Sequence, residues 1–137
     1  MVVVFARERI ASAGLADRLD AVVGDATAEP LPEGYDVLLA ANLVHYWSSE
    51  QTQEFLGRAR ADVEAGATLL LADFWTDPTH TKPVHAALMA GEFAMHLANG
   101  DVYSVDEVQS WLSDTGWQYV RTEPLAGPQS LVVARDV

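Results

Sequence analysis

The sequence contains no cysteine in its 137 residues, and this absence excludes disulfide bonds and thiolate metal sites. Basic residues are also few, because 8 lysines and arginines stand against 20 aspartates and glutamates, for a formal net charge of −12. Such a surface repels the phosphates of nucleic acids and the anionic face of a membrane, so we expect neither as a partner. No apolar run approaches the roughly 20 residues that a membrane-spanning helix requires.

The first five residues, from Met1 to Phe5, lack the basic segment and the cleavage site of a secretory signal. We therefore expect a cytoplasmic protein. Half of the residues are hydrophobic, and the length suits one domain with one core. No two histidines have the i, i+4 spacing with supporting acids that metal-binding helices show, so we expect no metal site.

An apolar run at residues 37–41 predicts one buried strand, and Asn42 and His45 follow where that strand should end. In open parallel α/β sheets, ligands bind just beyond the carboxyl ends of the strands. The imidazole of His45 is therefore a candidate general base, since its unperturbed pKa lies near neutrality. The alternative is a structural histidine that caps the strand or packs under Trp47.

Two capping boxes predict the starts of two helices. In the first, Ser48 is the N-cap and Gln51 reaches back, and the helix runs to about residue 63. In the second, Ser104 pairs with Glu107, and Gly116 closes the helix. The inward stripe of the first helix comprises Phe55, Leu56, Ala59 and Val63.

The remaining pattern alternates strands and helices. Helices are predicted at residues 2–13 and 84–97, strands at 19–23, 67–74, 117–122 and 130–135, loops at 26–34 and 75–83, and a turn at 99–101. The nearly all-apolar run at 67–74 is typical of a parallel strand that is covered on both faces. This order predicts the later portion of a doubly wound α/β domain.

The stretch Val44-His45-Tyr46-Trp47-Ser48-Ser49-Glu50 resembles the LHDWxDE motif of the S-adenosylmethionine-dependent O-methyltransferases of the plant phenolic and bacterial aromatic-polyketide type. The family's upstream spacing is matched by Gly24-Asp25, Pro30-Leu31-Pro32 and Tyr35-Asp36, and residues 127–134 resemble the closing strand of the bacterial branch. The resemblance covers nearly all of the chain. It implies S-adenosylmethionine as cofactor, a small aromatic or polyketide substrate, and a homodimer.

The family begins its cofactor domain with a strand, a glycine-rich loop, a helix and a second strand that ends in an acidic residue. None of these is present, and the chain has no G-x-G triplet. We therefore expect a partial Rossmann-like doubly wound sheet of the class I methyltransferase type, with its first two strands missing. Residues 1–137 would form a single domain, the C-terminal portion of a methyltransferase catalytic domain.

The missing strands would lie between the strands at 19–23 and 37–41. Without them, the strand at 19–23 has no neighbour and leaves its backbone groups unpaired. Either the chain is a piece of a longer enzyme, or its sheet is rearranged or completed by another chain.

The resemblance implies that His45 takes the proton from the substrate hydroxyl. It places the carboxylate that orients the histidine at Asp73, although the family usually has the longer glutamate there. The alternative for Asp73 is an N-cap or a loop ligand. A second family carboxylate falls on Val102, with Asp101 one residue away.

For the cofactor, the resemblance implies that Asp25 accepts the adenine amino group and that Ala26 flanks the adenine. Asn42 would lie near the methionine end. The alternative for Asp25 is a turn residue, which Gly-Asp pairs often provide. An apolar pocket for an aromatic acceptor would be lined by Trp75, Met89, Phe93, Met95 and His96, unless these residues are plain core.

The sequence therefore predicts O-methyl transfer from S-adenosylmethionine to an aromatic or polyketide hydroxyl, as part of a longer enzyme. One alternative is a non-catalytic relic kept as a binding or assembly module. Another is a cofactor-independent enzyme, such as a cyclase, that uses the same pocket. Since the glycine-rich loop is missing, we expect the isolated chain to bind the cofactor weakly or not at all and to be inactive.

Overall fold

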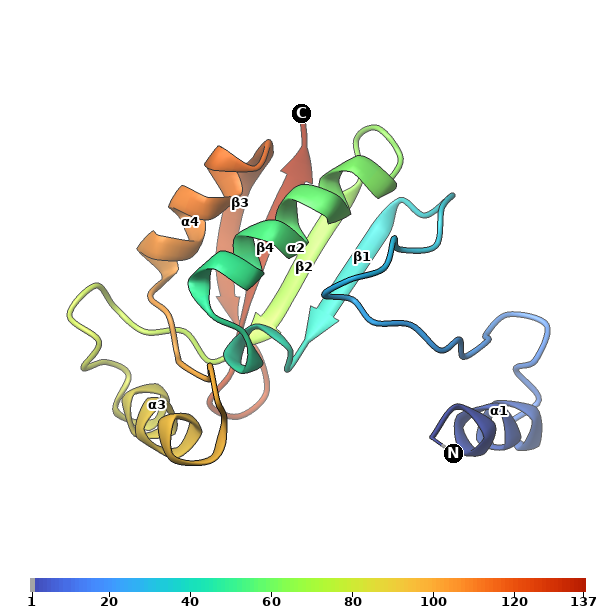
Figure 1. Cartoon of the computed structure of the whole chain (residues 1–137), viewed down its shortest axis with the longest axis horizontal. Coiled ribbons are helices and arrows are strands. Elements are labelled where there is room, and N and C mark those ends of the chain that lie inside the picture. Colours follow the sequence, from blue (N-terminus) through green and yellow to red (C-terminus); the bar gives the residue numbers. More distant parts are fainter. Residues whose placement is uncertain (1) are drawn as a thin grey trace.

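The computed structural model describes residues 2–137 as a mixed α/β fold (Figure 1). The elements are α1 (Val2–Ser12), β1 (Val37–Ala41), the 3₁₀ helix η1 (Val44–Tyr46), α2 (Ser49–Asp62), β2 (Thr68–Asp73), α3 (Val84–His96), α4 (Val105–Asp114), β3 (Trp117–Pro124) and β4 (Ser130–Asp136). This order confirms the predicted elements, except for the strand at residues 19–23.

The four strands form one sheet in the order β1-β2-β4-β3. β1 and β2 are parallel, whereas β4 runs antiparallel to both of its neighbours. The carboxyl ends of β1 and β2 therefore meet at the same edge of the sheet, where α3 also lies (Figure 1). The backbone N–H of Asn42 donates to Ala72 O at 2.9 Å, which extends this pairing to the point where His45 and Asp73 follow.

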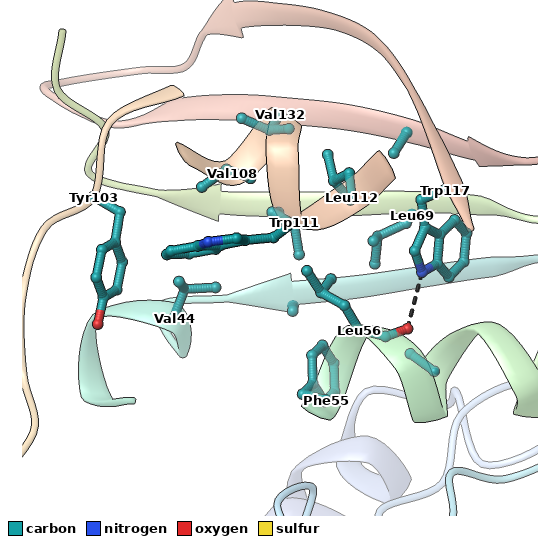
Figure 2. Packing of buried hydrophobic residues seen from close by; sticks show 14 of the residues in the cluster. Val44, Phe55, Leu56, Leu69, Tyr103, Val108, Trp111, Leu112, Trp117 and Val132 are labelled. Atoms are coloured by element: carbon teal, nitrogen blue, oxygen red, sulfur yellow. Dashed lines mark hydrogen bonds between the residues drawn. The ribbon is translucent and has the colours of Figure 1, made fainter. Parts of the chain in front are cut away.

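The core lies between the sheet and the helices α2 and α4, which cover one face (Figure 1). The predicted stripe of α2 is confirmed, since Phe55, Leu56 and Ala59 are buried and Val63 packs against the core. Figure 2 shows Leu56 and Trp117 side by side, where the indole N–H donates to Leu56 O at 3.0 Å. This bond satisfies a buried polar group that would otherwise destabilise the core.

Local signals in the sequence position both of these helices. The two capping boxes are formed, with Ser48 accepting from the backbone N–H of Gln51 and Ser104 accepting from that of Glu107. Gly116 follows α4 with φ of +86°, a left-handed conformation that glycine adopts at little cost.

The prediction that β1 is a buried strand is wrong for most of its length. Only Ala40 is buried, whereas Val37 and Leu39 are 51% and 58% exposed. Their side chains point to the face of the sheet opposite to α2 and α4, because alternate residues of a strand face opposite sides. β1 is also an edge strand, so one side of its backbone lacks a partner strand among residues 2–137.

The predicted strand at residues 19–23 is not formed. Val22 and Val23 are exposed, and no other strand of the described chain lies next to them. A strand requires a neighbour for its backbone hydrogen bonds, and none is available here. The helix α1 is formed as predicted, but it buries no side chain and lies apart from the sheet (Figure 1). Its Arg7 instead pairs with Asp20 through two hydrogen bonds of 2.8 and 3.1 Å.

Within residues 2–137, every helix is too short or too polar to cross a bilayer. The same part of the chain has no group of three or more histidines and acidic residues arranged to hold a metal ion.

Candidate active site

His45 and Asp73 form a buried pair where β1 and β2 end. The Nδ1 atom of His45 lies 2.7 Å from Oδ1 of Asp73, and the two residues are 6% and 1% exposed. The shorter aspartate side chain therefore reaches the imidazole directly. Because a carboxylate only accepts hydrogen bonds, this contact favours the tautomer with a proton on Nδ1 and a free lone pair on Nε2.

Asp73 is itself held by backbone groups. Its Oδ2 accepts from the backbone N–H of His45 at 3.3 Å, and its Oδ1 accepts from that of Phe74 at 2.9 Å. Asp73 therefore also has the structural role given above as its alternative, because its carboxylate connects η1 to the end of β2. A buried carboxylate with several donors has a fixed position, so it can orient the imidazole.

The turn at residues 97–101 lies against the backbone of His45. The N–H of Asp101 donates to His45 O at 3.2 Å, while the Asp101 carboxylate accepts from the N–H of Val102. Val102 is buried and apolar. The second carboxylate that the family resemblance implied beside the histidine is therefore replaced by an apolar side chain, and Asp73 is the acid that contacts the ring.

Tyr103 closes this side of the site. Its hydroxyl donates to Trp47 O at 2.7 Å, and its ring packs edge-on against Trp111 at 4.8 Å between ring centres. Burial, with a smaller contribution from the nearby Asp101 charge, raises the pKa of Tyr103 to about 12. The hydroxyl thus stays protonated and keeps the segment that contains His45 attached to the segment before α4.

A separate cavity of about 250 Å³ lies in the loop between α1 and β1, and its lining residues run from Val22 to Pro32. Asp25 and Ala26 are among the residues that line this cavity. The Oδ1 atom of Asp25 accepts from the backbone N–H and the hydroxyl of Thr27, and these bonds lower the pKa of the carboxyl. Asp25 therefore also has the turn role that was its alternative.

Asn42 adopts a left-handed conformation with φ of 54°, which is uncommon outside glycine and is best tolerated by Asn and Asp. Its side chain is exposed and accepts a hydrogen bond from Gln129. This conformation turns the chain sharply after β1 and directs it into η1, where His45 begins the site.

Arg58 was not predicted as a site residue, yet it holds the loop that lines the cavity. From α2, its guanidinium donates to Thr27 O at 2.6 Å and to Ala26 O at 2.8 Å. Asp62, one turn later on α2, accepts from the N–H of Leu31 at 2.9 Å. A basic residue on a helix is a weak signal in the sequence, because nothing there indicates which carbonyl groups it meets.

The five predicted pocket residues are not gathered around one cavity. Trp75 belongs to the core, and its indole N–H donates to Ser130 O. On α3, Met95 and His96 are exposed, and Met89 is half-buried. Phe93 is the member that reaches the histidine, since its ring stacks on the His45 ring with 4.1 Å between centres.

The family assignment rests on most of the chain rather than on this pair alone. The sequence profile of the O-methyltransferase domain matches residues 1–118. The chain belongs to this O-methyltransferase family. The order of its strands and the position of the histidine motif after β1 agree with the resemblance found in the sequence, and the family's members are methyltransferases.

The chain is 35% identical over 123 residues to the 3-hydroxy-5-methyl-1-naphthoate 3-O-methyltransferase of Streptomyces sahachiroi. The aligned region covers 90% of this chain and 35% of that protein. The solved O-methyltransferase family 2 protein from Planctomyces limnophilus in complex with apigenin superposes with a TM-score of 0.90 at 26% identity, covering 99% and 40% of the two chains. The S-adenosylmethionine-dependent methyltransferase SibL, in its apo form, gives a TM-score of 0.82 at 29% identity, covering 96% and 39%.

The chain thus spans 35% of the length of the curated relative and 39% to 40% of the solved structures. It corresponds to part of a class I methyltransferase fold.

Proposed function

We propose that residues 1–137 form the C-terminal portion of the catalytic domain of a longer enzyme, which transfers a methyl group from S-adenosylmethionine to a hydroxyl of an aromatic or polyketide substrate. The observation that supports this most strongly is the buried pair of His45 and Asp73, with 2.7 Å between Nδ1 and Oδ1. The relative from Streptomyces sahachiroi, named as a naphthoate 3-O-methyltransferase, supports the substrate class.

In this proposal, His45 accepts the proton of the substrate hydroxyl at Nε2. Asp73 keeps the proton on Nδ1 and stabilises the imidazolium that forms. When bound, S-adenosylmethionine supplies an electrophilic methyl group to the hydroxyl oxygen. Since the methyl group passes from one bound molecule to another, the rest of the acceleration would come from holding the two in line, and we assign part of that task to the apolar side chain of Phe93.

The residues present fit one end of the cofactor. The cavity lined by Asp25 and Ala26 measures about 250 Å³, which is below the roughly 300–1,000 Å³ of typical small-molecule sites. We propose that it takes the adenine end, with the loop held by Arg58. The left-handed turn at Asn42 would approach the methionine end, and the remaining contacts would come from residues outside 1–137.

We propose that four residues of α3 face the acceptor in the complete domain: Met89, Phe93, Met95 and His96. Trp75, which precedes α3, would support the pocket from the hydrophobic core. We also propose a homodimer, which is the assembly that the family resemblance implies.

Two other functions use different features of the chain. A non-catalytic binding module would keep the fold and the exposed apolar surface of β1 while having no use for Nε2 of His45. A cofactor-independent enzyme would use His45 without the loop at residues 22–32. Asp73 orients the buried imidazole, and this favours a catalytic role over a non-catalytic binding module. Arg58 holds the loop at residues 22–32 in place, and this favours a cofactor-dependent enzyme over a cofactor-independent one.

The proposal is tested by completing the domain. The part of the Streptomyces sahachiroi relative that precedes its match to this chain is fused ahead of residue 1. The fusion is then assayed with methyl-labelled S-adenosylmethionine and a panel of hydroxylated aromatic acids. We expect label on at least one acceptor from the fusion and none from either part alone. A folded fusion that binds the cofactor and methylates no acceptor would favour the binding module, and product formed without the cofactor would favour the third function.

A further inference from the structure

Two aromatic rings lie close to the imidazole of His45. The ring of Phe93 stacks on one face at 4.1 Å between centres with an angle of 6° between the planes. The ring of Tyr46 lies 4.5 Å from the imidazole at an angle of 35°. The nearly parallel contact is therefore the one with Phe93, which comes from a helix far from His45 in the sequence.

The hydrogen bond to Asp73 does not fix the plane of the imidazole by itself. It sets the direction of the Nδ1–H bond, but the ring can still rock about the line that joins Nδ1 and Oδ1. Such rocking would move Nε2, the atom that faces away from Asp73. A flat ring packed against one face opposes this motion, and aromatic rings stacked with an offset attract one another. Tyr46 is half-exposed, so it restrains the ring less.

Phe93 lies in the last turn of α3, just before the turn that contacts the backbone of His45. The N–H of Leu97 donates to Phe93 O at 2.8 Å, which ends α3 at the turn that bonds His45 O through Asp101. Gly100 lies in this turn, where a Cβ atom would come within 2.6 Å of Leu97 Cβ and 3.0 Å of His45 O. The close approach of the turn to His45 therefore requires glycine at position 100.

We propose that Phe93 is a positioning residue for His45, whose ring fixes the imidazole plane so that Nε2 keeps one direction. Asp73 and Phe93 restrain different motions of the ring, since Asp73 controls the in-plane direction of Nδ1–H and Phe93 controls the tilt. The role in turnover rests on the proposed function, whereas the restraint on the ring is a property of the chain itself.

Nuclear magnetic resonance of residues 1–137 tests the restraint without any cofactor. A parallel ring at this distance shields the imidazole C–H protons, and a restrained ring keeps its Nδ1–H proton in slow exchange with water. We expect an upfield position of these C–H signals and a visible Nδ1–H signal in the unmodified chain and in Phe93→Tyr. Both should be lost in Phe93→Leu and retained in Leu88→Ala, a control at an exposed position of α3. Identical His45 signals in Phe93→Leu and the unmodified chain would overturn the proposal.

The consequence for catalysis is measured in the completed enzyme. We expect Phe93→Leu to lower kcat by about 10- to 10²-fold, as misplacement of a reacting group does, with the KM for S-adenosylmethionine unchanged. Phe93→Tyr should keep most of kcat. A raised KM for the acceptor with unchanged kcat would overturn the positioning role and leave Phe93 as a pocket residue. If the unmodified enzyme methylates no acceptor, the proposed function fails, and the resonance experiment decides the positioning proposal alone.

Discussion

The Nδ1 atom of His45 and the Oδ1 atom of Asp73 lie 2.7 Å apart in a buried contact at the carboxyl ends of two parallel strands. Removing the imidazole should abolish proton transfer without disturbing the loop at residues 22–32. We therefore expect His45→Ala, in the completed enzyme, to lower turnover by about 10²–10⁴. The measurement is turnover with a phenolic acceptor, together with the dissociation constant of S-adenosylmethionine, which should stay nearly unchanged. Unchanged turnover would remove His45 from the mechanism.

Replacing Asp73 by asparagine should affect both catalysis and stability. The amide cannot provide the charged acceptor that selects the Nδ1–H tautomer, so we expect a loss of turnover similar to that of His45→Ala. The backbone N–H groups of His45 and Phe74 also lose their charged partner, which costs about 1.5–3 kcal/mol for each such bond that is not replaced. Urea denaturation measures this loss. Asp101→Asn is the control, because this exposed residue bonds the backbone of the same histidine through its own N–H, and an equal effect of the control would contradict the prediction.

The fold should weaken in alkali through Tyr103. Its pKa is raised to about 12 in the folded protein, because burial disfavours the phenolate, against about 10 in the unfolded chain. Below pH 10 the hydroxyl is protonated in both the folded and the unfolded state, so Tyr103 makes its full contribution to the free energy of unfolding. Between pH 10 and 12 the unfolded state loses the proton first, so the free energy of unfolding falls as pH rises. Thermal unfolding between pH 8 and 12 should show this fall, and it should be smaller in Tyr103→Phe than in Tyr46→Phe. Equal falls in both variants would assign it to other groups.

The edge of β1 should make the isolated chain associate. Leu39 is 58% exposed beside an unpaired strand edge, which is the arrangement that favours pairing between chains. We expect dimers or larger species in light scattering and a shift toward the monomer in Leu39→Lys. Leu88→Lys is the matched control, since Leu88 is 68% exposed but lies on α3. A sharp monomer peak for the unmodified chain would count against this prediction.

Local signals in the sequence predicted much of the fold. The capping boxes at Ser48 and Ser104 form as predicted because a cap depends on residues only three positions apart. The apolar runs at residues 67–74 and 130–135 predicted β2 and β4, because each run is also a local feature of a few consecutive residues. Residues 19–23 have the composition of a strand, but pairing needs a neighbouring strand, and none of the described residues provides one. The prediction that Leu39 is buried was wrong for a different reason, since its side chain points to the face of the sheet opposite to α2 and α4.

The candidate site was predictable only in part. The motif identified His45, and the parallel pairing brings it to Asp73 even though aspartate is shorter than the family's usual glutamate. The stacking of Phe93 on His45 and the clamp of Arg58 on the loop depend on how α3 and α2 pack, which no spacing in the sequence encodes. Trp75 is a large aromatic residue of the kind that lines pockets, yet its position after β2 directs its side chain into the core.

A calorimetric titration of S-adenosylmethionine into residues 1–137 tests the proposed cofactor site most directly. We propose that the chain provides the base and the adenine end of this site, whereas the glycine-rich loop and the acidic residue that holds the ribose belong to another part of the complete enzyme. Two lost hydrogen bonds to charged groups cost roughly 3–6 kcal/mol, or about 10²–10⁴ in affinity. We therefore predict a dissociation constant of about millimolar or weaker, against the micromolar binding expected of a complete enzyme. A micromolar dissociation constant for this chain would contradict the proposal of a partial cofactor site and indicate that the site has been rebuilt.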